Sequence, residues 1–313
     1  MSYNIVRYIQ VAGEIEKAPG LNIAAVQGNI GQDQKWSPAM RLATIETYIG
    51  LSEQALAKGH NPPALFVWPE TALPFPVNDN PYFNALKREF IKKDRIWLLA
   101  GAPFYKRVAG RASSGEDQGI LSYNSAYLIN PEGVAIDRYD KQHLVPFGEY
   151  IPFRRFLPLP GPLVDNIGDF STGRPEKPLS CQGAEIGVLI CFESIFPELA
   201  REWTATGANL LVNITNDAWF GRSSAPWQHL SMAVFRAVEN RRSLVRSANT
   251  GVSAFIDPLG RMSATTPLFK PAYLVEEVPL LQAGTIFVSF GHYFGLLCLL
   301  GCLPLAAILK KQK

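Results

Sequence analysis

Three residues far apart in the chain have the types that acyl transfer requires. Glu70 could act as a general base, Lys141 could stabilise a developing oxyanion, and Cys191 could act as the nucleophile. Apolar, strand-like runs at 64–68 and 185–190 lead to the glutamate and to the cysteine. Catalytic groups of α/β enzymes gather at the ends of sheet strands, so we expect the three side chains to converge there.

Each residue alone has an ordinary structural interpretation. A cysteine in an apolar strand is usually an inert core residue. Lys141 follows Asp140, and a surface ion pair between them would contribute little stability. The functional interpretation therefore depends on the order of the three residues and on the sequences around them. Those sequences are PETALP at 69–74, YDKQHLVPFGE at 139–149 and NDAWFG at 216–221.

With these flanks the chain resembles the nitrilase superfamily, which uses Glu, Lys and Cys in this order, and in particular its apolipoprotein N-acyltransferase branch. The resemblance runs from about Leu21 to the C-terminus. It implies an α/β fold, a nitrilase-like α-β-β-α sandwich. It also implies acyl transfer from a phospholipid, through a thioester on Cys191, to the N-terminal diacylglyceryl-cysteine of an apolipoprotein. No metal or cofactor is required by that chemistry.

The resemblance also indicates acidic residues that support the lysine and the cysteine. Glu149 follows the lysine motif, and Glu193 lies two residues beyond the cysteine. Either acid could orient Lys141 or tune its charge, as outer acids orient catalytic groups. The backbone N–H of Phe192 is expected to be a second oxyanion donor, because the residue after a nucleophile often has that role.

Three further residues are candidates for substrate binding. Asn124 and Trp219 resemble positions that shape the substrate site, and Trp36 has a weaker claim to its lipid-facing rim. Structural roles stay open for two of them: Asn124 could cap a strand edge, and Trp219 could pack in a loop. His143 and His229 are interpreted as ordinary hydrogen-bonded histidines.

A membrane-spanning helix is predicted at the C-terminus, over residues 286–309. This segment contains no Asp, Glu, Lys or Arg, and a helix of that length at ~1.5 Å per residue spans the ~30 Å hydrocarbon core. A buried core helix is the alternative. The basic tail at 310–313 favours a cytoplasmic C-terminus, which would place the catalytic domain on the periplasmic side of a bacterial inner membrane.

The remaining chain divides into an N-terminal segment and one catalytic domain. Residues 1–20 have neither a signal-peptide core nor a membrane span, and we interpret them as a linker or a truncated N-terminal region. Residues 21–283 form the predicted catalytic domain. Because relatives of the acyltransferase branch carry membrane helices ahead of this domain, we expect the chain to be a fragment or a reading frame begun late. Helices supplied by a separate chain are the alternative.

Composition and charge restrict the partners. The 313 residues are 47% hydrophobic and 18% charged, with a formal net charge of +3. Acids and bases are interspersed and no nucleic-acid motif occurs, so nucleic acid is not an expected partner. The expected partners are a phospholipid donor, an apolipoprotein acceptor and the membrane. The four cysteines indicate neither a disulfide framework nor a metal site.

Strand-like and helical segments alternate along the chain, as α/β folds require. A hairpin is predicted over 122–130 and 134–139, just before the lysine. Residues 146–178 are rich in proline and apolar side chains, and they could form either a lid or a cover over the core. Two other functions remain open: a nitrilase-type amidase that acts on a small amide, and a membrane-tethered binding or scaffold protein.

Overall fold

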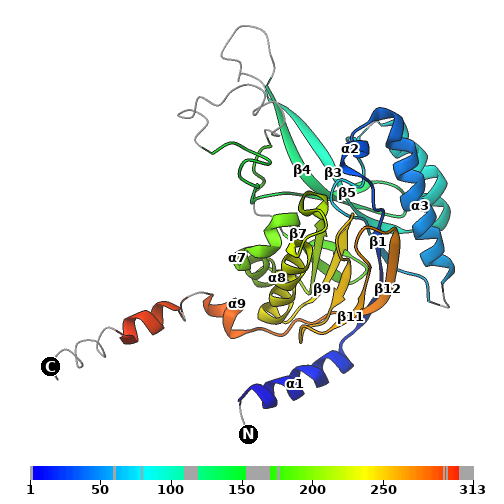
Figure 1. Ribbon diagram of the computed structural model, residues 1–313. Helices are drawn as coiled ribbons and strands as arrows, with labels where there is room; N and C mark the ends of the chain where they lie inside the picture. Colours follow the sequence, from blue (N-terminus) through cyan, green and yellow to red (C-terminus); the bar gives the residue numbers. More distant parts are fainter. Residues whose placement is uncertain are drawn as a thin grey trace, which may run out of the picture.

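The computed structural model describes residues 3–58, 61–78, 80–108, 119–152, 170–174, 177–291, 293 and 295–302. Two six-stranded sheets form its centre (Figure 1). The first sheet has the order β12 (Ala272–Pro279), β1 (Gly20–Gln27), β2 (Leu65–Val67), β3 (Trp97–Val108), β4 (Gly119–Ile129) and β5 (Ala135–Asp140). The second has the order β11 (Met262–Thr265), β10 (Ala254–Ile256), β9 (Ser243–Ala248), β8 (Leu210–Thr215), β7 (Ala184–Ile190) and β6 (Leu179–Cys181).

Each sheet has a parallel centre and antiparallel edges. β1, β2 and β3 run parallel in the first sheet, as do β7, β8 and β9 in the second. Parallel neighbours need long crossover connections, and helices provide them. The crossover helices are α3 (Arg41–Ala57), α4 (Pro81–Leu86), a π-helical turn (Lys87–Ile91) and α5 (Lys92–Asp94) in the first half, and α7 (Pro197–Ala205) and α8 (Ala225–Asn240) in the second.

The helices cover the outer faces of the sheets and produce an α-β-β-α arrangement (Figure 1). Alternate residues of β2 point to opposite faces of the first sheet and pack in different cores. Leu65 and Val67 lie in the core between the sheets, whereas Phe66 packs in a second core on the side of α3 and α4. Because successive strand residues point to opposite faces, a run that is apolar throughout fits a strand that is covered on both sides. The predicted nitrilase-like α/β fold with two sheets is confirmed.

The structure describes each terminal segment in part. Tyr3–Lys17 form helix α1 within the segment interpreted as a linker. At the other end, α9 (Ile286–Phe290) is five residues long, and Gly291 follows it with a left-handed φ of 56°. Helical residues continue at 293 and 295–302, and the rest of the predicted span lies outside the described residues. Within the described part of the chain, none of the helices has the length and apolar character that a bilayer crossing requires.

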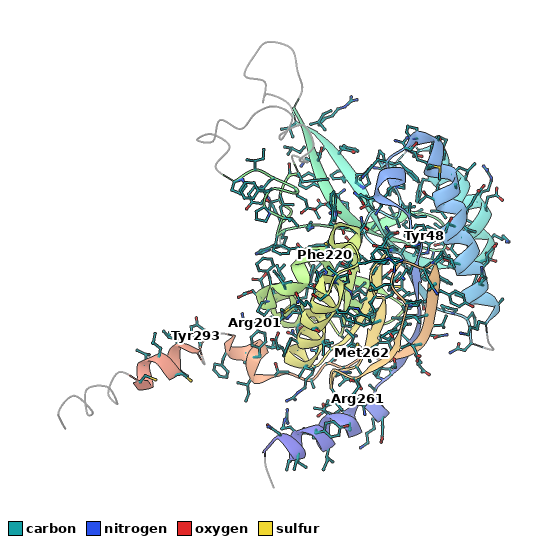
Figure 2. The ribbon with its side chains drawn as sticks, viewed as in Figure 1. Tyr48, Arg201, Phe220, Arg261, Met262 and Tyr293 are labelled. Atoms are coloured by element: carbon teal, nitrogen blue, oxygen red, sulfur yellow. The ribbon has the colours of Figure 1, made fainter. Side chains whose placement is uncertain are left out.

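Both terminal segments project from the layered body (Figure 1). Arg201 of α7 holds α9 by donating from Nε to the carbonyl oxygens of Val288, at 2.9 Å, and Phe287, at 3.2 Å. Beyond this contact the chain turns away, and Tyr293 is 64% exposed on the projecting segment (Figure 2). The apolar loop residues predicted as a lid or cover, 153–169, lie outside the described residues.

Candidate active site

Glu70 lies just beyond β2, where the chain leaves the parallel centre of the first sheet. Its path is fixed by backbone hydrogen bonds around Gly101 of β3: the Gly101 N–H donates to the Pro69 carbonyl at 3.2 Å, and the Leu73 N–H donates to the Gly101 carbonyl at 3.0 Å. A Cβ atom on Gly101 would lie 2.7 Å from the Glu70 Cα, so only glycine permits this approach. The Glu70 side chain is thereby held in a buried position.

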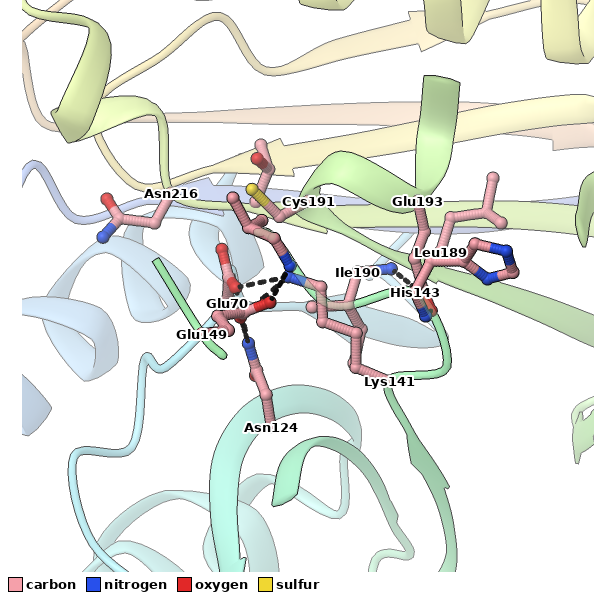
Figure 3. Close-up of polar contacts among 12 residues, drawn as sticks. Glu70, Asn124, Lys141, His143, Glu149, Leu189, Ile190, Cys191, Glu193 and Asn216 are labelled. Carbon is pink, nitrogen blue, oxygen red and sulfur yellow. Dashed lines mark hydrogen bonds and ion pairs between the residues drawn. The ribbon is translucent and has the colours of Figure 1, made fainter. Parts of the chain in front are cut away.

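The buried residues Glu70, Asn124 and Lys141 and the partly buried Glu149 form a group that we call the carboxylate–lysine cluster (Figure 3). Lys141 Nζ lies 2.9 Å from Glu149 Oε1 and 3.7 Å from Glu70 Oε1. Asn124 Nδ2 donates to both glutamates, at 2.7 Å to Glu70 Oε1 and 3.0 Å to Glu149 Oε1. Burial acts to lower the pKa of Lys141, but the charges of Glu70, Cys191 and Glu149 prevail and raise it. The lysine therefore stays an ammonium at neutral pH.

Cys191 follows β7 and begins a 3₁₀ turn, Cys191–Ile195. Its φ is 53°, a left-handed conformation that costs a non-glycine residue ~1–3 kcal/mol. The turn is held from within and from α8, because the Cys191 carbonyl oxygen lies 3.2 Å from Ser194 Oγ of the same turn and 3.0 Å from His229 Nε2. Burial, the largest cause, and the Glu70 charge raise the pKa of the Cys191 thiol to about 12. The resting sulfur is therefore protonated.

Glu193 joins the turn after Cys191 to the loop after Lys141. Its carboxylate accepts hydrogen bonds from the hydroxyl of Tyr139 at 2.8 Å, and from the backbone N–H groups of Ile190 at 2.7 Å and His143 at 3.0 Å. Burial raises the pKa of Glu193, while the backbone hydrogen bonds from Ile190 and His143 and the charge of Lys141 oppose that shift. The two predicted supporting acids thus have different contacts. Glu149 contacts the Lys141 ammonium, whereas Glu193 binds backbone N–H groups on either side of the site.

A second buried lysine, which the sequence analysis missed, lies beside the same glutamate. Lys35 ends the short helix α2 (Gln32–Lys35), is 1% exposed, and donates from Nζ to the Glu70 backbone carbonyl at 2.8 Å. Burial lowers the pKa of Lys35 to about 8, although the charges of Glu70 and Cys191 act in the opposite direction. The polar segment around Lys35 has no periodicity that would have predicted burial.

Asp217 of the 3₁₀ turn after β8, His229 of α8 and Arg246 of β9 form a second group, which we call the aspartate–arginine cluster. Asp217 Oδ1 lies 3.0 Å from His229 Nδ1, and Arg246 Nη2 donates to Asp217 Oδ2 at 2.8 Å. Burial raises the pKa of Asp217, but Arg246 and His229 outweigh it and hold the value at about 2. Burial and Arg246 lower the pKa of His229, so its ring is neutral at pH 7. The sequence analysis predicted hydrogen bonds for His229 but not this cluster.

The remaining candidate residues lie in different surroundings. Asn124 donates hydrogen bonds to Glu70 and Glu149, so its side chain does more than cap a strand edge. Trp219 and Trp36 are exposed, at 75% and 43%, and Phe192 packs edge-to-face against Phe196. Their roles toward a substrate stay predictions. Among the residues that the structure describes, no group of His, Cys, Asp and Glu could hold a metal ion.

Comparison with known proteins places this site in a family. Residues 22–286 match the carbon-nitrogen hydrolase family. The chain is 44% identical to an apolipoprotein N-acyltransferase of Geobacter metallireducens over 93% of the chain, and 40% identical to one of Brucella melitensis over 79% of it. These matches cover 54% and 46% of the two relatives, so the chain spans about half the length of the curated relatives it matches.

Solved structures agree on the fold. Nit3 of Saccharomyces cerevisiae, a member of branch 10 of the nitrilase superfamily, is 18% identical, with a TM-score of 0.62 over 83% of this chain and 90% of Nit3. A carbon-nitrogen hydrolase of Helicobacter pylori is 20% identical, with a TM-score of 0.58 over 83% of this chain and 89% of that protein. The resemblance noted in the sequence is therefore confirmed, and the chain belongs to the carbon-nitrogen hydrolase family of the nitrilase superfamily.

Proposed function

We propose that this chain is the catalytic part of an apolipoprotein N-acyltransferase, in which Cys191 carries the acyl group. The observation that carries the proposal is the convergence of Glu70 and Lys141 from one sheet with Cys191 from the other (Figure 3). Identities of 32–44% to relatives with that name support the choice of reaction.

The first half-reaction forms a thioester. Cys191 Sγ attacks the acyl ester carbonyl of a phospholipid while Glu70 accepts the thiol proton. Because the pKa of Cys191 is raised to about 12, we expect this proton to leave as the sulfur attacks rather than beforehand. The Lys141 ammonium stabilises the tetrahedral oxyanion, with the Phe192 N–H as the second donor. The ester C–O bond then breaks, Glu70 returns the proton to the leaving oxygen, and a lysophospholipid departs.

The second half-reaction moves the acyl group to nitrogen. The α-amine of the N-terminal diacylglyceryl-cysteine attacks the thioester carbonyl, and Glu70 again accepts a proton. The C–S bond breaks, the thiol of Cys191 is restored, and an N-acylated apolipoprotein leaves. Glu149 keeps Lys141 in place throughout by its 2.9 Å contact. Asn124 holds the Glu70 carboxylate at 2.7 Å. We assign Trp36 and Trp219 to the substrate site, which their exposure supports.

We further propose a membrane arrangement for the chain. Residues 21–283 form the catalytic domain on the periplasmic side of a bacterial inner membrane, 286–309 form a membrane helix, and 310–313 a cytoplasmic tail, with 1–20 as a linker ahead of them. The absence of formal charge from 286–309 and the basic tail support this arrangement. The exposure of Leu297, 65%, on the projecting segment also supports it.

The test mixes the detergent-solubilised chain with phosphatidylethanolamine and a synthetic peptide that begins with diacylglyceryl-cysteine. Mass spectrometry follows the N-acylated peptide. We expect product with the unmodified chain and with Cys181→Ala, which removes a buried cysteine outside the site, and none with Cys191→Ala. No product from the unmodified chain, together with hydrolysis of a small amide that depends on Cys191, would contradict the acyltransferase and indicate an amidase.

A further inference from the structure

Thr215 ends β8 beside the residue that follows β7. In the parallel pairing of these strands Ile190 lies opposite Ile214, so Cys191 and Thr215 are the next residues on neighbouring strands. The Thr215 side chain is fully buried, and a hydrogen bond from its hydroxyl acts to lower the pKa of the Cys191 thiol. The mechanism above gives this hydroxyl no role, although Thr215 is the neighbour of the reacting cysteine on the adjacent strand.

The same hydroxyl has a second acceptor. Thr215 Oγ1 donates to Asp217 Oδ1 at 3.1 Å. A hydroxyl carries one hydrogen and rotates to suit its acceptors, so it cannot donate fully to the carboxylate and to a thiolate at once. Asp217 does not depend on Thr215, because His229 Nδ1 lies 3.0 Å from Oδ1 and Arg246 Nη2 donates to Oδ2 at 2.8 Å. The carboxylate stays paired when the hydroxyl turns away.

We propose that the Thr215 hydroxyl alternates between two acceptors, the Asp217 carboxylate while Cys191 is a thiol and the Cys191 sulfur while it is a thiolate. In that step the S–H bond breaks, the proton passes to Glu70, and the intact Thr215 O–H turns from Oδ1 to Sγ. No proton passes through Thr215. Asp217 is a positioning residue that holds the hydroxyl ready in the resting state. The inference rests on the proposed role of Cys191 as the nucleophile.

The groups around the Cys191 sulfur determine whether each substitution should raise or lower the pKa of the thiol. Burial is the largest cause that raises the pKa of Cys191, and the carboxylates of Glu70 and Asp217 raise it further, whereas Lys141 and the Thr215 hydrogen bond lower it. The charge of Cys191 also acts on the buried Lys35. Thr215 and Asp217 therefore act on the thiolate in opposite directions, although they are bonded to each other. A loss of structure alone would not produce that opposition.

The test is the rate at which iodoacetamide alkylates Cys191 in the full chain at pH 8, followed by peptide mass spectrometry. Alkylation needs the thiolate but neither phospholipid nor apolipoprotein. Free glutathione added to the same sample is the reference thiol. Thr215→Val should slow Cys191 about threefold, because a rise of about one pKa unit reduces the thiolate fraction about tenfold and increases its nucleophilicity about threefold. Thr215→Ser should stay within about twofold of the unmodified chain.

Asp217→Asn should accelerate alkylation of Cys191 about threefold, by the same arithmetic with the opposite sign. If this variant does not fold, the comparison of Thr215→Val with Thr215→Ser decides. Equal rates for those two variants, or slower alkylation in both Thr215→Val and Asp217→Asn, would overturn the inference. The predicted alkylation pattern without any acyl transfer would overturn the proposed function and leave the role of Thr215 intact.

Discussion

The carboxylate–lysine cluster and the aspartate–arginine cluster both act on Cys191, but they differ in how many of their polar atoms have hydrogen-bond partners. In the first, one ammonium faces two glutamates, and Asn124 Oδ1 is buried without a hydrogen-bond partner among the described residues. In the second, both oxygens of Asp217 have partners, and Arg246 also donates to Val252 and Asn213.

The difference indicates a division of labour. A cluster with unused hydrogen-bonding capacity can take on a proton or a reacting group, at a cost in stability. A cluster whose polar atoms are all paired instead fixes the backbone around it, here the left-handed turn at Cys191. We therefore expect substitutions in the first cluster to reduce activity most, and substitutions in the second to reduce stability most.

The largest effect is expected for Glu70→Gln, which removes the base from the first cluster and keeps its shape. Thioester formation with phosphatidylethanolamine should slow by about 10²–10⁴-fold, the usual contribution of a positioned general base. Rapid-quench mass measurements would give the rate. Glu132→Gln is the matched control, because Glu132 is exposed and pairs with the exposed Arg95. A Glu70→Gln rate within tenfold of the control would remove Glu70 from the mechanism.

The second cluster should show the largest loss of stability. Asp217→Asn leaves the guanidinium of Arg246 buried without its counter-ion, and urea unfolding at pH 7 should give a loss of about 3–5 kcal/mol. Because the pKa of Asp217 is lowered from 3.8 to about 2, its contribution is present above pH 3.8 and disappears as the pH falls toward 2. The difference between variant and parent should therefore narrow in that window. A constant difference would contradict the pairing.

Lys35, next to the carboxylate–lysine cluster, is a buried charge that should reduce the stability of the folded chain. Folding lowers the pKa of Lys35 from 10.5 to about 8. Between these pH values Lys35 is therefore protonated in the unfolded chain and neutral in the folded chain. The stability of the parent relative to Lys35→Met should rise by up to about 3 kcal/mol between pH 8 and 10.5. Urea unfolding across that range measures it. Lys92→Met, at an exposed position, should show no such trend.

Glycine substitutions test the backbone under each cluster and should have the smallest effects. In Gly101→Ala the new methyl group would lie 2.5 Å from the Thr71 nitrogen, and we expect the shifted Glu70 to slow thioester formation about tenfold. In Gly251→Ala it would lie 2.1 Å from Asp217 Oδ2, and the thermal midpoint should fall more than the rate. Gly50→Ala, with no atom within 4 Å, is the control. Equal loss of activity in Gly101→Ala and Gly251→Ala would contradict the assignment of activity to the first cluster and stability to the second.

The sequence predicted the elements that carry Glu70, Lys141 and Cys191 because their signals are local. Apolar runs lead to Glu70 and Cys191, and a turn at 131–133 closes the hairpin ahead of Lys141. The segment 106–119 is rich in Gly, Ser and charged residues, a composition typical of an exposed loop, yet β3 continues to Val108 and pairs with β4. Local patterns therefore identified most strands but not their ends.

The features that the sequence could not predict depend on contacts between distant segments. β12 pairs with β1, so that Glu276 lies opposite Ile23, and nothing in the sequence of either strand selects that partner. The burial of Arg246 within a strand becomes favourable only because Asp217 and Asn213 lie opposite it. Lys35 is buried for a similar reason, since its ammonium reaches the Glu70 carbonyl across the first sheet's end.

The position of the acyl group tests the central claim most directly. The chain would be incubated with phosphatidylethanolamine, digested at acidic pH, and mapped by mass spectrometry with and without hydroxylamine. Our account predicts one hydroxylamine-labile acyl group, on the peptide that contains Cys191, and none on Cys181, Cys298 or Cys302. An acyl group on one of those cysteines in place of Cys191, or one that resists hydroxylamine, would contradict the account.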